Sequence, residues 1–456
     1  MQPEAQNDGV RPADGPSLGV SCLIHGITAA LLLAAGWLLG GRPELAVHWG
    51  WARTPLVGTA AVLALLPVLH RHRRFARFNA QLCLTLVSVV VVIAAAEVGF
   101  RLAKFDFRRQ EAFLRRIPPY YQKPTVPTGE VFFRRPGPRD WTGQVIRSVV
   151  RALGLPTDTY RDEPVVTVHY NRFGFRNDDN LKAWDIAVVG DSFTELGYLP
   201  AEELFTTILG RRLNRRVLNL GVASTGPFTY LSYLQDYGLC PEVRETLVVF
   251  NEGNDMEDLR REQADGQRFQ RTGQRPRREV HPQTSLLRAV GELSRRTALP
   301  APQLPVDAWF QSAHGRIAVT LQPPPRSRAD QPAEALQALA TFADRYVAFA
   351  RQHNVRPWLA YMPCKQRICH GRLEFSAAAA DNIKTWRPND LPAVVAAECD
   401  RTGIGFIDLT PALREATDRT GELLFNTIYD THLNAGGSAV VAEALARALA
   451  AGPLAR

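Results

Sequence analysis

Five short and almost wholly apolar runs recur along the C-terminal two thirds of this 456-residue chain, and they limit its fold more than any other feature. Longer stretches with helical periodicity lie between them, such as Ala333–Gln352 and Leu391–Thr402. Apolar strands that alternate with helices are typical of a parallel sheet covered on both faces. The sequence therefore predicts an α/β fold, a three-layer α/β/α sandwich with a parallel sheet. The runs are Trp184–Val189, Val217–Leu220, Thr246–Phe250, Trp358–Met362 and Gly405–Leu409.

Four short polar segments carry the residue types of acyl-transfer chemistry, and most of them adjoin a predicted strand. They are Gly190–Thr194, Asn219–Gly221, Gly253–Asp255 and Asp430–Asn434. Together they supply a nucleophile, a base, an orienting carboxylate and oxyanion donors. Taken singly, each is equally explained as an ordinary turn or helix cap. The complete set in this order favours an enzyme.

These motifs resemble the GDSL/SGNH hydrolase family, whose four namesake residues map onto Ser192, Gly221, Asn254 and His432. The resemblance extends from about residue 170 to the C-terminus, with a gap in the middle, and implies an SGNH hydrolase-like fold. The segment 171–176 also resembles membrane-anchored members of the family. The residues before 150 match no catalytic pattern.

Each of the matched residues has an expected role. Ser192 would attack an ester carbonyl and offer its backbone N–H to the oxyanion, because it would start a helix directly after a strand. His432 would take the hydroxyl proton as a neutral imidazole. Asp430 would orient that ring, and Asp408 is a weaker alternative. Many family members place the Asp three residues before the His; the two-residue spacing here resembles the subgroup that includes alginate O-acetyltransferases.

Gly221 and Asn254 are the further expected oxyanion donors, through a backbone N–H and a side-chain amide. The family usually shows a Gly two residues before this Asn, whereas here Glu252 holds that position and Gly253 intervenes. Lys365 resembles part of a Pro-x-Lys element in related anchored proteins. It is expected either to bind substrate or to be exposed to solvent.

No cofactor or metal is expected. Four cysteines of the globular part permit up to two disulfides in an exported domain, with the pairing open. Cys364 and Cys369, followed by His370, fit no common zinc pattern, which favours a disulfide or free buried thiols. The other two are Cys240 and Cys399.

Long apolar runs predict a membrane anchor over 1–103 with three transmembrane helices, at about 20–39, 50–69 and 80–100. A cleaved signal peptide is the competing interpretation of the first run, but a cationic start is missing and two more runs follow. Basic residues on either side of the third run favour opposite orientations. The family resemblance resolves this conflict and implies a multi-pass protein of the cell (inner) membrane with an extracytoplasmic, periplasmic catalytic domain.

After the anchor, residues 104–160 are basic and rich in Pro, which predicts a juxtamembrane linker. The hydrolase-like domain is expected over 161–456, with an insertion at about 260–332. That insertion shows no strong strand pattern and some helix near 286–294. It is a candidate lid or partner surface, or a tolerated loop.

The formal net charge of +9 suits anionic lipid head groups or a plain solvated surface, and no nucleic-acid motif accompanies it. The expected partners are the lipid bilayer, an acylated glycan or small ester, and a membrane acyl-donor protein. We interpret the chain as a membrane-anchored serine esterase or O-acyltransferase that acts on acyl esters, above all acetyl esters, of envelope or extracellular glycans through an acyl-serine intermediate. The alternative is a non-catalytic anchored module that binds glycan in a polysaccharide assembly or modification complex.

Overall fold

The computed structural model describes residues 73–103, 137–152, 162–273 and 306–452, together with residues 19, 22–23, 25–26, 29–30, 57, 105, 107, 135 and 285–286. The chain divides into two compact units. The first comprises 1–111 with 282–300, and the second comprises 112–281 with 301–456. The helix expected near 286–294 and the first two predicted transmembrane runs lie almost entirely outside the described residues.

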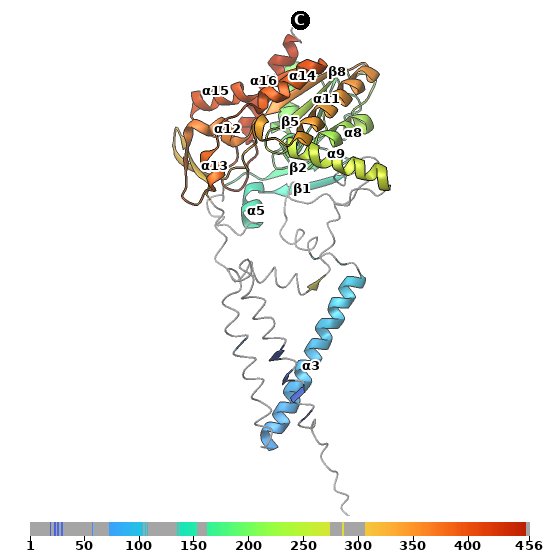
Figure 1. The fold of residues 1–456 in the computed structure, drawn as a ribbon, viewed down its shortest axis with the longest axis vertical. Coiled ribbons are helices and arrows are strands. Elements are labelled where there is room, and N and C mark those ends of the chain that lie inside the picture. Colours follow the sequence, from blue (N-terminus) through green and yellow to red (C-terminus); the bar gives the residue numbers. More distant parts are fainter. Residues whose placement is uncertain are drawn as a thin grey trace, which may run out of the picture. The chain divides into compact units, whose positions relative to one another are not determined.

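A five-stranded parallel sheet forms the centre of the second unit (Figure 1). The strands lie in the order β4-β3-β5-β8-β10. The chain leaves β3 on one side to form β4 and returns to its other side for β5, and ligands bind at such a switch point in open α/β sheets. The strands are β3 (Ile186–Val189), β4 (Val217–Asn219), β5 (Glu245–Asn251), β8 (Arg356–Met362) and β10 (Gly405–Asp408).

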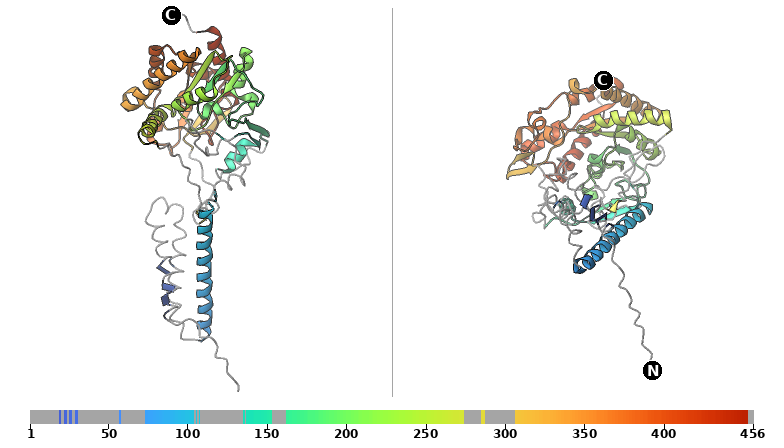
Figure 2. Two further views of the ribbon diagram at one scale, coloured as in Figure 1. Left: turned by 90° about the vertical axis from the view of Figure 1, so that its right-hand side faces the viewer. Right: turned by 60° about the horizontal axis from the view of Figure 1, so that its bottom comes forward.

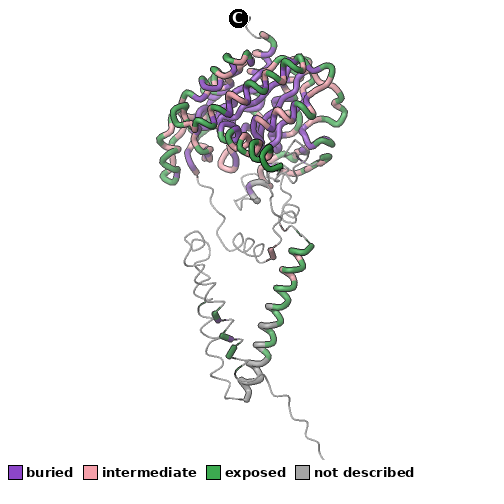
Figure 3. Tube along the Cα trace, turned by 45° about the vertical axis from the view of Figure 1, so that its right-hand side comes forward, coloured by how far each residue is buried: buried purple, intermediate pink, exposed green. Residues whose placement is uncertain are grey.

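Successive side chains of this sheet enter two separate apolar cores, one on each face. Ile186 and Val188 share a buried cluster with three helices: α7 (Phe205–Leu213), α15 (Thr410–Thr420) and α16 (Ala435–Ala451). Ala187 and Val189 share the other with α8 (Pro227–Tyr237), α9 (Asp255–Thr272), α11 (Ala333–His353) and α14 (Leu391–Thr402). The predicted α/β sandwich with a parallel sheet is therefore confirmed. Figure 2 shows the helices from two further directions, and Figure 3 shows the strands buried within them.

A second, antiparallel sheet has the strand order β7-β6-β9. Its strands are β6 (Ala308–Ser312), β7 (Gly315–Val319) and β9 (Leu373–Phe375). Because β6 and β7 lie within 260–332, the expectation that this insertion lacks strands is wrong. Buried and more exposed residues alternate over the first residues of β6, so its sequence has the pattern of a short amphipathic strand and not that of a continuous apolar strand.

The folded domain begins before residue 161. Strand β1 (Arg139–Gly143) pairs antiparallel with β2 (Val166–Tyr170), and α5 (Val145–Ala152) lies between them in the sequence. The Glu163 carboxylate accepts hydrogen bonds from Ile146 N and Arg147 N at 2.6 and 2.7 Å, which holds the first turn of α5. This part of the predicted 104–160 linker is thus structured.

Several short helical segments connect the larger elements. They are α6 (Ser192–Glu195), η4 (Ala201–Glu203), η5 (Arg328–Asp330), α12 (Lys365–Cys369), η6 (His370–Arg372) and α13 (Asp381–Thr385). Two of them matter for the site, because α6 begins with the expected nucleophile and α12 begins with Lys365.

In the first unit, α3 (Arg73–Leu102) is one continuous helix that includes the third predicted transmembrane run. Leu84, Val92 and Leu102 are exposed on it. Of the helices that the structure describes, none is long and apolar enough to cross a membrane. The transmembrane anchor stays a prediction.

Candidate active site

The structure brings together the three residues that the sequence proposes as a catalytic triad. His432 Nε2 lies 2.7 Å from Ser192 Oγ, although 240 residues separate the two in the sequence. His432 Nδ1 lies 2.5 Å from Asp430 Oδ1. A neutral ring that donates from Nδ1 to the carboxylate presents Nε2 to accept the hydroxyl proton, which is the arrangement that nucleophilic serine chemistry requires.

Ser192 is held at the carboxyl end of β3 by a tight turn. The Asp191 side chain caps α6 by accepting a hydrogen bond from Phe193 N at 2.8 Å. A Cβ at Gly190 would lie 2.1 Å from Thr194 Oγ1, so the turn needs glycine there. Ser192 is partly exposed, and its N–H donates to no group in the part of the chain that the structure covers. Its hydroxyl and its N–H are both available to a substrate.

The imidazole and the carboxylate of the triad are buried. Burial lowers the pKa of His432, which favours the neutral ring that a general base needs. Burial also raises the pKa of Asp430 to about 6, while hydrogen bonds to its ionised form oppose that shift. Asn426 Nδ2 supplies one of these at 3.0 Å, and Thr431 N supplies another at 2.8 Å. Asp408 instead accepts from Thr410 N at 2.8 Å.

The direction of the Asn254 amide is set by two neighbours that sequence reasoning missed. Asn254 Oδ1 accepts from Asn251 Nδ2 at 2.6 Å, and Asn254 Nδ2 donates to Asp258 Oδ2 at 2.7 Å. A primary amide has two N–H donors, and the Asn254 side chain also hydrogen-bonds the Asp191 carboxylate, so a substrate oxygen would have to share the second donor. Asn251 Nδ2 also donates to Asp191 Oδ2 at 2.9 Å, which links the Asn254 side chain to the turn of Ser192. Asn251 directly follows the predicted strand Thr246–Phe250, and this position could have identified it as a residue of the site.

Gly221 lies beside this site, but its N–H is already engaged. It donates to Asn219 Oδ1 at 2.8 Å, so a substrate oxygen would have to share that donor. A Cβ at position 221 would lie 2.4 Å from Glu195 N. Glycine is therefore required here because the loop after β4 packs closely against α6.

The structure places Lys365 in the interior, which contradicts both expectations for it. Its side chain is fully buried, and its Nζ donates to the carbonyl oxygens of Asn426 and Asp430 at 2.7 and 2.8 Å. Further bonds go to Thr320 O at 3.0 Å and Thr427 O at 3.3 Å. Burial lowers the pKa of Lys365 to about 8. Lys365 ties the triad loop to its surroundings and presents no group to a substrate.

The buried carboxylate of Glu195, the last residue of α6, connects this helix to its neighbours. Glu195 Oε2 accepts from Arg135 Nη2 at 3.0 Å and from Ala223 N at 2.6 Å, and Glu195 Oε1 accepts from the Tyr170 hydroxyl at 2.6 Å. These contacts join α6 to β2 and to the loop after Gly221. Arg135 lies in the predicted linker, where no sequence signal pointed to it.

The cysteines and acidic residues in the described ranges form neither a disulfide nor a metal-binding group. Cys240, Cys364, Cys369 and Cys399 are free thiols, so the disulfides that the sequence permits do not form among them. Within the described ranges, no group of three or more His, Cys, Asp or Glu residues could hold a metal ion.

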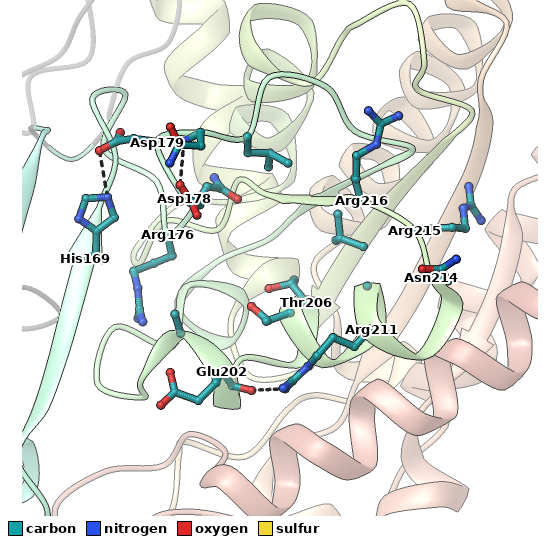
Figure 4. A pocket seen from close by; sticks show the side chains of 17 residues that line it. His169, Arg176, Asp178, Asp179, Glu202, Thr206, Arg211, Asn214, Arg215 and Arg216 are labelled. Carbon is teal, nitrogen blue, oxygen red and sulfur yellow. Dashed lines mark hydrogen bonds and ion pairs between the residues drawn. The ribbon is translucent and has the colours of Figure 1, made fainter.

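Two cavities of the domain differ in whether Asn254 lines them. One of about 950 Å³ is lined by charged side chains, and Figure 4 shows several of them in contact with one another. His169 Nε2 lies 3.4 Å from Asp179 Oδ2, and Arg211 Nη2 donates to the Glu202 carbonyl at 2.5 Å. No triad residue lines this cavity. None lines the second cavity either, a groove of about 670 Å³, but Asn254 does, so the groove adjoins the expected oxyanion site.

Comparison with solved structures finds similar proteins at low identity. An acetyl xylan esterase, AlAXEase, is 11% identical with a TM-score of 0.32, and the match covers 58% of this chain and 99% of that one. A member of the lipolytic protein G-D-S-L family from Veillonella parvula DSM 2008 is 11% identical with a TM-score of 0.30, covering 58% and 96%. Est24, a carbohydrate acetylesterase from Sinorhizobium meliloti, is 11% identical with a TM-score of 0.30, covering 59% and 99%. No protein-family model and no curated protein matches the chain.

Proposed function

We propose that this chain is an SGNH-type serine enzyme that transfers acyl groups from esters through an acyl-serine intermediate. The observation that carries this proposal is the continuous hydrogen-bond chain from Ser192 through His432 to Asp430. An alternative role as a binding module would not need these three side chains in that order. The resemblance of the surrounding motifs to the GDSL/SGNH family supports the same reaction class.

In the proposed mechanism, Ser192 Oγ attacks the ester carbonyl carbon while its proton passes to His432 Nε2. Asp430 stabilises the imidazolium that forms. The carbonyl oxygen gains the negative charge and accepts hydrogen bonds from Ser192 N–H and from the second Nδ2–H of Asn254, with Gly221 shaping the same pocket. The bond to the alcohol oxygen then breaks, His432 returns the proton to that oxygen, and the acyl group stays on Ser192.

The second half of the reaction decides the product. Water that loses a proton to His432 and attacks the acyl-serine makes the chain an esterase, whereas a sugar hydroxyl makes it an O-acyltransferase. We propose acetyl esters of envelope or extracellular glycans as substrates, in either direction. The support is the two-residue spacing of Asp430 and His432, which resembles the glycan O-acetyltransferase subgroup. A membrane acyl-donor protein is the partner that transfer would need.

We also propose that the catalytic domain is anchored to the cell (inner) membrane on its extracytoplasmic side. This part rests on the sequence: the apolar runs at 20–39 and 80–100 have the length of membrane-spanning helices. The exposed apolar side chains along α3 are compatible with an apolar environment.

Hydrolysis of p-nitrophenyl acetate by the full chain tests the enzyme. Ser192→Ala should lower kcat by about 10³ or more, because the acyl-serine cannot form. Ser232→Ala, on α8 and away from the triad, is the matched control and should keep the full rate. Equal rates in Ser192→Ala and the unmodified chain would instead favour a non-catalytic glycan-binding module.

A further inference from the structure

We infer that the groove beside Asn254 binds the alcohol portion of the substrate, and that this portion is a neutral oligosaccharide. This inference rests on the proposed function and adds to it a site and a substrate class. The argument uses the position of the groove, the chemistry of its walls and its charge balance.

The groove adjoins the proposed oxyanion site, although no triad residue lines it. Its lining includes Gly253 and Asn254, the residue proposed to bind the oxyanion. One wall is α9, and the other is the segment 323–337, which contains the start of α11. A volume of about 670 Å³ exceeds what an acetyl group occupies, so the groove has room for the remainder of an ester bound at Ser192.

The walls offer side-chain amides beside the surfaces of proline rings. Two glutamines come from α9 and two from the opposite wall: Gln263, Gln267, Gln331 and Gln337. A primary amide both donates and accepts hydrogen bonds, as sugar hydroxyl groups do. Among side chains other than proline, the apolar lining consists of Met256 and Ala264. A long acyl chain would deprive these amides of water without offering hydrogen bonds in return, so the groove suits a hydroxyl-rich ligand better.

The charged side chains of the groove balance one another. Arg260 Nε donates to Glu257 Oε2 at 3.1 Å, and the buried Glu252 accepts from Arg367 Nε at 2.6 Å. The two other charged residues of the lining, Arg326 and Glu334, have opposite signs. Among the described residues of the lining together with Arg367, three carboxylates face three guanidinium groups, which favours a neutral sugar chain over a uronate polymer.

One wall of the groove is stiff. Prolines have a fixed φ and no side-chain rotamers to lose on binding, so they lower the entropic cost of ordering the wall around a ligand. The prolines that line the groove are Pro323, Pro324, Pro325 and Pro332. They also present flat C–H surfaces, to which the C–H faces of sugar rings are complementary.

The substitution Ala264→Trp tests the inference in the full chain. Ala264 is exposed on α9 and lines the groove, so an indole there would occupy it without entering a core. The probes are acetylated xylotetraose and p-nitrophenyl acetate, whose alcohol part is a single ring. We expect Ala264→Trp to lower the ratio of kcat/KM for the tetrasaccharide to kcat/KM for the small ester by about tenfold or more.

Gln270→Trp is the matched control, because Gln270 lies on the same helix and does not line the groove. It should leave that ratio unchanged. Unacetylated xylotetraose should compete with the acetylated form in the unmodified chain, and tetragalacturonate should not. An unchanged ratio in Ala264→Trp, or equal competition by tetragalacturonate, would overturn the inference. A chain that releases no alcohol from either ester, with or without xylotetraose as acyl acceptor, would instead overturn the proposed function.

Discussion

The Asn254 amide owes its direction to Asp258, so the two should act as one unit in catalysis. Asn254→Ala should lower kcat by about 10²–10³, the usual loss for one oxyanion donor. Asp258→Ala should lower kcat by about tenfold with KM little changed, because Asn254 can then rotate. Steady-state kinetics on p-nitrophenyl acetate measure both, with Asp265→Ala on α9 as control. Losses that simply multiply in the double variant would contradict the coupling.

The buried pair of Asp430 and His432 sets the expected pH dependence. The pKa of His432 lies below its ordinary value, so the neutral base persists as the pH falls. The pKa of Asp430 is raised to about 6, and its protonation removes the negative charge that stabilises the imidazolium. The acid limb of kcat/KM should therefore lie at about pH 6 or below.

Asn426→Ala should move that limb to higher pH, because it removes a hydrogen bond to the ionised form of Asp430. The unmodified chain measured over the same buffers is the reference. A limb centred above pH 7 in both proteins would contradict this assignment.

Among the elements, α12 stabilises the triad loop through the buried ammonium group of Lys365. Lys365→Met should lower the unfolding temperature and kcat together, since each buried carbonyl left without a donor costs about 1–3 kcal/mol. Lys384→Met on α13, where the lysine contacts a single carbonyl, should change neither. Thermal unfolding and ester kinetics check this. If Lys365→Met instead kept a normal kcat and raised the KM for the tetrasaccharide, Lys365 would have to be assigned to substrate binding.

Lys365 also predicts how stability changes with pH. Its pKa is about 8 in the folded chain and 10.5 in the reference state, so between these values the unfolded chain binds more protons. The free energy of unfolding contributed by this group therefore rises with pH over that window. The free energy of unfolding of the unmodified chain, relative to that of Lys365→Met, should be larger at pH 10 than at pH 8. A smaller value at pH 10 would contradict a lowered pKa of Lys365.

The contact of α6 with β2 depends on Glu195. Glu195→Ala leaves Arg135 in the interior without this carboxylate, and breaking a buried ion pair in this way costs about 3–5 kcal/mol. We expect a large loss of stability by denaturant unfolding, whereas Glu202→Ala on η4 should be nearly neutral because Glu202 is exposed. Equal stabilities would show that Glu195 does not support the turn of Ser192.

For the whole molecule, the sequence predicts the elements whose pattern is local and continuous. The strands β5 and β8 contain the apolar segments 247–250 and 358–362, and most of the motif residues follow strand ends, so parallel pairing brings these to one edge of the sheet. The short strand β6 pairs with β7 on one side and with β9, which is distant in the sequence, on the other, and neither β6 nor β7 is continuously apolar, so the apolar-run pattern does not identify them. The roles of Arg135 and Lys365 depend on tertiary burial, which residue type alone does not determine.

The division into two units predicts separable functions. A chain lacking 1–103 keeps every strand of the central sheet and every triad residue. Its kcat/KM on p-nitrophenyl acetate should stay within about twofold of the full chain, because domains with their own core fold alone. The full chain should sediment with membranes and resist carbonate extraction, whereas the shortened chain should not. A full chain in the soluble fraction would contradict the anchor.

The account depends most directly on a covalent acyl group at Ser192. Mass spectrometry of the full chain, quenched in acid during turnover of p-nitrophenyl acetate, tests for it. We predict one added acetyl group, located on the peptide that contains Ser192. This acetyl group should be absent in Ser192→Ala. Turnover of the ester without any acetyl group on Ser192 would contradict the account.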